Sequence, residues 1–257
     1  MTSRLSAIAL NTFREAVRDR VLYNLIVFVL LLASAPLFGT ISIGIERVIL
    51  INVGLSAISF FGMVIAIFIG IGLVSKEIEK KTLYTILSRP VRRWEVIAGK
   101  YCGLVLTLVI NALFMTVAFF LALLITAHKF QASDGGILVA IYFIILQFLM
   151  ITAITLLFSS FSTPIFSAIF AFSLFALGTF ADDLRQFTSA AHGVNHWFMT
   201  AAVYLVPNIS SLNVIGQVAH DRPIAGDLIL ANTVYALFYS LAVTAAAVVI
   251  FERRNLK

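Results

Sequence analysis

His192 and His196 are the pair of side chains whose type and spacing come closest to a metal site. Four residues apart, they would share one face of a helix, and imidazole nitrogens placed in this way can bind zinc. No carboxylate stands at a similar helical offset, and a hydrated loop also accounts for both histidines. We predict no metal ligands, and keep a membrane-bound enzyme or metal-handling assembly factor using these histidines as the alternative function.

Other catalytic patterns are missing or incomplete in the sequence. The pair Gly99-Lys100 lacks the earlier glycine of a phosphate-binding P-loop, and no Gly-x-Ser-x-Gly element provides an acyl-transfer nucleophile. Asp182 and Asp183 lack the further acidic residues of a phosphotransfer site, and the single cysteine, Cys102, excludes an internal disulfide. The chain is therefore predicted to be no enzyme and to bind no cofactor itself, so that any ATP and magnesium would belong to a partner.

The composition is that of an integral membrane protein. Of 257 residues, 61% are hydrophobic and only 12% are charged, and the mean hydropathy is +1.05. Charged residues gather in a few short stretches, which leaves no room for a soluble catalytic domain. We predict one all-α transmembrane domain over residues 1–257.

Six apolar segments contain no Asp, Glu, Lys or Arg and reach or approach the length of about 20 residues that a bilayer requires. The predicted transmembrane helices cover residues 21–40, 48–75, 101–127, 137–158, 164–181 and 228–251. Because ionisable residues at membrane depth mark ion pathways, proton or sodium coupling is not expected.

The distribution of basic residues predicts the orientation. Fourteen of the 18 Lys and Arg residues fall on the side that holds both termini and the 76–100 loop, and four fall on the other side. By the positive-inside rule both termini and this loop are cytoplasmic. The basic character therefore reports topology, and no nucleic-acid partner is expected.

Residues 4–20 are predicted to form an amphipathic helix on the cytoplasmic membrane surface. Its apolar face is formed by Leu5, Ile8, Ala9, Thr12, Phe13, Ala16 and Val17. This helix would either brace a docked protein or act only as a topological anchor.

The 76–100 loop is the most highly charged cytoplasmic stretch, yet it keeps apolar residues at helical spacing. A first helix is predicted from Lys76 to Ser88, ending before Pro90, and a second from near Arg92 into the third span. The first would insert into a groove on another protein or, alternatively, rest on lipid.

The external stretch 182–227 contains an apolar portion, Trp197 to Val206, that is too short to cross a bilayer. We expect it to form re-entrant helices before the last span, broken by a turn at Pro207 and Asn208.

Uncharged polar residues in the spans could line a substrate path, although hydrogen bonding between helices is their commoner use. The candidate path residues are Asn52, Ser56, Asn111, Gln147 and Asn232. Gly62, Ala66 and Gly70 have the spacing that lets helices pack closely.

Three stretches resemble the permease subunits of type-2 ATP-binding-cassette exporters, particularly the compact six-span bacterial permeases. They are NTFREAVRDRVLY near the N-terminus, VSKEIEKKTLYTILSRPVRRWEVIAGKYCG after the second span, and VPNISSLN before the last span. The second stretch is similar to the coupling helix of that family.

The resemblance implies an exporter in the bacterial inner membrane that works by alternating access. It implies two separate ABC ATPase subunits that bind ATP and push on the coupling helix, and a second permease, identical or related. Carried over by position, the candidate ATPase contacts are Glu77, Glu79, Thr82, Leu83, Leu87, Arg89, Arg14, Glu15 and Arg18. A passive scaffold is the remaining alternative, and the sequence does not identify the substrate.

Overall fold

The computed structural model describes residues 2–16, 26–31, 46–79, 92–127, 134–190, 200 and 206–253. Throughout this described part the regular structure is helical, which agrees with the predicted all-α class. The candidate residues Arg18, Thr82, Leu83, Leu87 and Arg89 lie outside the described residues.

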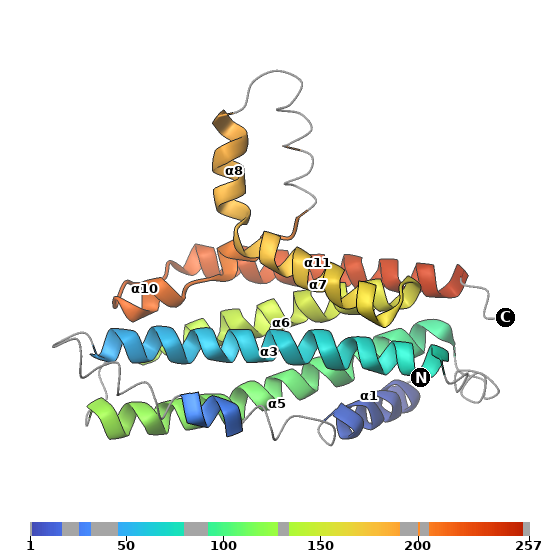
Figure 1. Cartoon of the computed structure of the whole chain (residues 1–257), viewed down its shortest axis with the longest axis horizontal. Coiled ribbons are helices and arrows are strands. Elements are labelled where there is room, and N and C mark those ends of the chain that lie inside the picture. The colour runs from blue at the N-terminus through green and yellow to red at the C-terminus, as the bar shows by residue number, and fades with distance from the viewer. Residues whose placement is uncertain are drawn as a thin grey trace.

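The principal helices, named as in Figure 1, are α1 (Thr2–Ala16), α3 (Glu46–Glu79), α5 (Arg93–Ala127), α6 (Gly135–Phe161), α7 (Pro164–Thr179), α8 (Ala181–Ala190) and α11 (Gly226–Arg253). A 3₁₀ turn, η3 (Ser210–Leu212), and the short helix α10 (Ile215–Ala219) precede α11.

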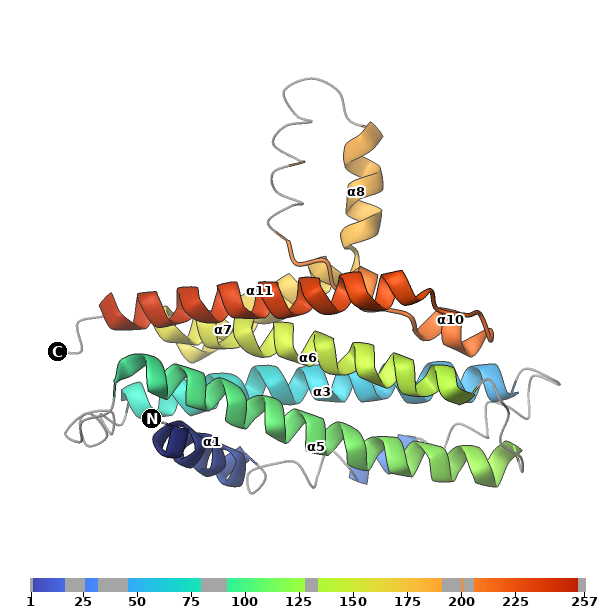
Figure 2. The ribbon, with the colours of Figure 1, turned by 180° about the vertical axis from the view of Figure 1, so that it is seen from behind.

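Figures 1 and 2 show α3, α5, α6 and α11 as long rods running side by side, with the N and C labels at the same end of the bundle. α6 lies at the centre, in contact with α3, α5, α7 and α11. Its side chains form much of the core, including Phe143, Phe148 and Leu156, none of them more than 1% exposed. α6 is therefore the hub around which the other helices pack.

Four of the described helices are long and apolar enough to cross a bilayer: α3, α5, α6 and α11. α7 is apolar but has only 16 residues, close to the lower limit for a span. Of the predicted first span, the structure describes residues 26–31 as helical, with Phe28 fully buried and edge-on to Phe61 of α3. A multi-pass architecture is thus established, while six crossings remain a prediction.

Two of the long helices extend beyond their predicted spans. α3 continues unbroken through Lys76 to Glu79, because no proline or glycine interrupts the sequence after Gly72. A separate helix beginning at Lys76 is therefore not observed over the four described residues of that segment. α5 begins at Arg93, as predicted, so residues 80–92 connect the two helices.

α1 is helical over Thr2–Ala16, which covers most of the segment predicted to be amphipathic, and its apolar face is turned towards α5. A Cβ added at Gly99 would lie 2.7 Å from Ile8, and one added at Gly103 would lie 2.5 Å from the carbonyl oxygen of Ala9. Thr12 is buried in the same contact. The two glycines, one helical turn apart, form a notch in α5 in which α1 lies.

Close packing between α3 and α6 depends on two of the three small residues singled out in the sequence. Gly62 faces the ring of Phe148, and Gly70 faces the methyl group of Thr155. Both side chains would overlap with an added Cβ, at 1.9 and 2.8 Å respectively. The predicted close packing is confirmed, and the partner helix is α6.

α7 touches the bundle mainly through small residues, whereas most of its large side chains stand outside. Its buried residues are Ser167, Ala171 and Gly178, while Ile165 and Phe166 are 74% and 56% exposed. α8 follows it and projects away from the bundle (Figures 1 and 2). The outer face of α7 is free to meet lipid or another chain.

Candidate functional site

A polar hollow of about 260 Å³ lies between α3, α6, α7 and the segment before α10. It is lined by Ser56, Ser59, Phe60, Gln147, Phe175, Thr179, Ile209, Asn213 and Ile215. Hydroxyl and amide groups thus share its wall with aromatic and aliphatic side chains. Such a surface can accept apolar groups and hydrogen-bond to uncharged polar groups of a ligand.

Gln147 organises this hollow from the hub helix. Its Oε1 accepts a hydrogen bond of 2.9 Å from Oγ of Ser59, and its Nε2 donates to the carbonyl oxygen of Leu212 at 3.3 Å. The side chain is only 3% exposed, so these bonds satisfy an amide that would otherwise be costly to bury. Gln147 therefore links α3 and η3 through α6.

The segment before α10 is held from a second side by α11. Nδ2 of Asn232 donates to the carbonyl oxygen of Ser211 at 2.9 Å, and Oη of Tyr235 accepts from the backbone N–H of Asn208 at 2.9 Å. Oδ1 of Asn208 accepts from the hydroxyl of Ser210 at 2.7 Å, which closes the turn predicted at this position. This segment, residues 206–213, forms the outer wall of the hollow. It is thus fixed to both α6 and α11.

Gly178 allows this segment to approach the end of α7. A Cβ at Gly178 would lie 2.7 Å from the carbonyl oxygen of Pro207, and the N–H of Ile209 donates to the carbonyl oxygen of Gly178 at 3.1 Å. The backbone of the segment packs directly on the backbone of α7. A larger residue at position 178 would push the two apart and reshape the hollow.

The five predicted path residues have different environments. Ser56 and Gln147 line the hollow, and Asn232 supports its wall. Asn52 instead donates to the carbonyl oxygen of Val48 within α3. Asn111 is 2% exposed, and neither of its amide atoms is hydrogen-bonded within the described part of the chain. Neither of these two lines the hollow, and a substrate role for all five remains a prediction.

The end of the bundle that holds both chain termini carries the described part of the predicted ATPase contacts. Glu77 and Glu79 lie on the last turn of α3, where the helix continues past the predicted span. Arg14 is exposed and Glu15 half-buried near the end of α1. Their contacts with an ATPase remain predictions.

The first turns of α5 bury two charged residues that the predicted spans did not include. Oε2 of Glu95 accepts from the backbone N–H of Arg92 at 3.0 Å, and the N–H of Glu95 donates to the carbonyl oxygen of Arg92 at 3.0 Å. The carboxylate thus caps the start of the helix. Glu95 and Lys100 are 2% and 4% exposed, so this end of α5 is packed into the protein.

Several residues of the hollow were not predicted from the sequence. Thr179 and Asn213 lie 34 positions apart, and only the fold brings them together. The Gly99–Gly103 notch did have a sequence signal, because Gly-x-x-x-Gly marks a close helix contact. Phe175 of α7 also lines the hollow and was not singled out from the sequence.

The two histidines on which the metal alternative depends, His192 and His196, lie outside the described residues. Among the residues that are described, no group of three or more His, Cys, Asp or Glu side chains could hold a metal ion.

Membrane-length helices packed around the central helix α6 define a multi-pass membrane protein, which contains a hollow of mixed polar and apolar lining. The family model for ABC-2 family transporter proteins matches residues 6–256. The chain belongs to the ABC-2 family of transporter proteins. It is a permease component of an ABC transporter, a membrane transport subunit of a kind that associates with ABC ATPases.

No significant match was found among curated proteins.

Proposed function

We propose that this chain is the permease subunit of an ATP-driven exporter and that it moves its substrate by alternating access. Two separate ABC ATPase subunits bind ATP with magnesium and push on the segment between α3 and α5. The family match over residues 6–256 supports the transport role.

The observation that carries the coupling mechanism is the way α1, α3 and α5 meet at one end of the bundle. Residues 80–92 connect α3 directly to α5, and α1 is packed in the glycine notch of α5. A displacement of this segment would therefore act on two long helices and on α1 together. Because packed helices move as units, the push would reach the core around α6.

The polar hollow is proposed to be part of the substrate path. It faces the end of the bundle opposite to the one where α1, α3 and α5 meet. Its lining offers hydroxyl and amide groups next to Phe60 and Phe175, and none of the described residues that line it is Asp, Glu, Lys or Arg. A substrate that fits this chemistry is largely apolar with a few uncharged hydrogen-bonding groups. Ser56 and Gln147 would contact it directly.

The complete transporter is proposed to contain two permeases, a homodimer or a pair of related chains, in the bacterial inner membrane with both termini in the cytoplasm. The exposed large residues on α7 provide the apolar face that we propose for contact with the second permease. The position of the N and C labels at one end of the bundle supports a common side for both termini (Figure 1).

The decisive experiment is co-purification of the chain with its P-loop ATPase from native membranes, followed by charge reversal. Glu77→Lys and Glu79→Lys are expected to weaken the association and to lower substrate-stimulated ATP hydrolysis. Glu252→Lys, at the same end of the bundle on α11, is the matched control and should retain both. If both α3 variants keep wild-type association and hydrolysis, the coupling assignment is wrong.

A further inference from the structure

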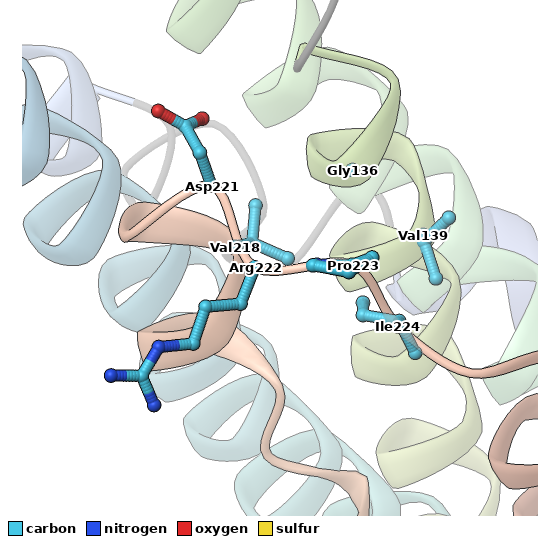
Figure 3. A pocket seen from close by; sticks show the side chains of 7 residues that line it. All are labelled: Gly136, Val139, Val218, Asp221, Arg222, Pro223 and Ile224. Atoms are coloured by element: carbon cyan, nitrogen blue, oxygen red, sulfur yellow. The ribbon is translucent and has the colours of Figure 1, made fainter.

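A second hollow, of about 330 Å³, lies at the end of the bundle away from the chain termini. It is formed by the first turns of α6, the end of α10 and the loop leading to α11. Its lining residues are Gly136, Val139, Val218, Asp221, Arg222, Pro223 and Ile224 (Figure 3). None of them belongs to the polar hollow described above.

The height of this hollow relative to the bilayer follows from the helices around it. α6 begins at Gly135 and α11 at Gly226, and both are long enough to span the membrane. The hollow lies beside the first turns of α6 and just before the start of α11. It is therefore at the boundary between hydrocarbon and water, where lipid headgroups lie.

The chemistry of the lining is divided between an apolar floor and a charged rim. Val139, Val218 and Ile224 provide aliphatic surface, while Asp221 and Arg222 are both exposed. In Figure 3 the carboxylate and the guanidinium point away from one another. No ion pair joins either of them to another of the described residues. Two opposite charges on adjacent residues thus border the apolar surface, and because both side chains are exposed they can turn towards it.

The backbone of the two residues that carry these charges is fixed by hydrogen bonds to α10. The N–H of Arg222 donates to the carbonyl oxygen of Gln217 at 2.9 Å, and the N–H of Asp221 donates to that of Val218 at 3.1 Å. This pair of bonds is the Schellman motif that ends a helix, and its central residue adopts a left-handed conformation. That residue is normally glycine, yet here it is Asp221, with a φ of 53°. A carboxylate is therefore kept at a position where glycine would be less strained.

We propose that this hollow, the Asp221–Arg222 site, binds the zwitterionic headgroup of a phospholipid of the outer leaflet. Arg222 pairs with the phosphate and Asp221 with the ammonium group, and the acyl chains extend along the apolar floor. A rim with one charge of each sign favours a zwitterionic headgroup over an anionic one. The site goes beyond the proposed transport function and requires no nucleotide.

The test measures lipid binding to the delipidated full-length protein in detergent by native mass spectrometry. Dioleoyl phosphatidylethanolamine is expected to bind better than dioleoyl phosphatidylglycerol. Neutralising one charge at a time, in Asp221→Asn and Arg222→Gln, should weaken phosphatidylethanolamine binding about two- to fivefold, as for an exposed ion pair. Asn tolerates the left-handed conformation, so Asp221→Asn keeps the turn.

The matched controls remove the same charges elsewhere, in Asp183→Asn on α8 and Arg253→Gln on α11, and should leave lipid binding unchanged. Equal or tighter binding of phosphatidylglycerol, or wild-type binding by both site variants, would overturn the proposal. So would equally tight binding of free phosphoethanolamine, because the ligand would then be a soluble compound rather than a lipid.

A further variant separates loss of the carboxylate from loss of the turn. Asp221→Gly relieves the strained φ and should raise the thermal unfolding temperature while still weakening phosphatidylethanolamine binding. If this variant binds the lipid as tightly as the wild type, the carboxylate has no part in recognition and the assignment fails.

Discussion

α6 and α7 follow one another in the chain and are almost equally apolar, yet they occupy opposite situations. α6 buries seventeen of its 27 residues, while α7 buries three of 16, all of them small. Only two residues, Ser162 and Thr163, separate the end of α6 from the start of α7. Hydropathy therefore shows that both helices are strongly apolar, but it does not distinguish a hub from a peripheral helix.

The difference lies in which residues are small. α7 presents Ser167, Ala171 and Gly178 to the bundle and directs most of its large residues outwards, whereas α6 directs phenylalanines into the core. In a membrane the exposed large residues cost little, because lipid is as apolar as they are. The peripheral helix can thus keep a broad surface for lipid or for a second permease.

The sharpest test of the contrast compares phenylalanine removal on the two helices. Phe143→Ala, at a fully buried site on α6, should lower the free energy of unfolding by about 3 kcal/mol through lost packing. Phe172→Ala, at a site 53% exposed on α7, should change it by less than about 0.5 kcal/mol. Equilibrium unfolding in mixed detergent micelles measures both, and equal losses would contradict the distinction between hub and periphery.

α1 is peripheral as well, but the glycine notch should make it sensitive to a single methyl group. Gly103→Ala places a Cβ against the backbone of Ala9, and the overlap should destabilise the protein by about 1–3 kcal/mol. A spin label on the exposed residue Ala7 should become more mobile. Gly216→Ala, where an added Cβ meets nothing within 4 Å, is the matched control. If the label in Gly103→Ala is no more mobile than in the wild type, the notch does not hold α1.

Gln147 connects the hub to the outer wall of the polar hollow, and its removal should have an intermediate effect. Gln147→Leu loses the bonds to Ser59 and Leu212 and should cost about 0.5–1.5 kcal/mol. Hydrogen exchange of residues 206–213 should accelerate. Asn52→Leu, which loses only a bond within its own helix, should leave that exchange unchanged. The same exchange rates in both variants would exclude Gln147 as the anchor of this wall.

The smallest effect is expected on α8. Asp182 and Arg185 pair at 3.3 Å with exposed side chains, so Asp182→Asn should change the free energy of unfolding by less than about 0.5 kcal/mol. The measurement is again unfolding in mixed micelles. A loss above about 1 kcal/mol would mean that Asp182 stabilises the protein through more than a surface ion pair.

Periodicity predicted the local structure well because it depends only on neighbours in the chain. The apolar face of α1, from Leu5 to Ala16, and the start of α5 near Arg92 were both predicted. The contact of α1 with α5 was not predicted, since hydropathy does not distinguish lipid from another apolar helix as the neighbour of an apolar face.

The candidate site depended more on long-range contacts and was predicted only in part. Ser56 and Gln147 were recognised as polar residues within spans, but Thr179 and Asn213 reach the same hollow from other elements. The left-handed turn at Asp221 gave no sequence signal, because the glycine that usually marks such a turn is absent. Thr82, Leu83, Leu87 and Arg89 remain predictions from resemblance.

The glycine notch of α5 also decides where a reporter should be placed. Because α1 is seated on α5, a fluorophore at Ala7 would follow the movement of α5, while one at Glu252 would follow α11. Energy transfer between the two dyes would then record the rearrangement of the helices during turnover in a single-molecule measurement.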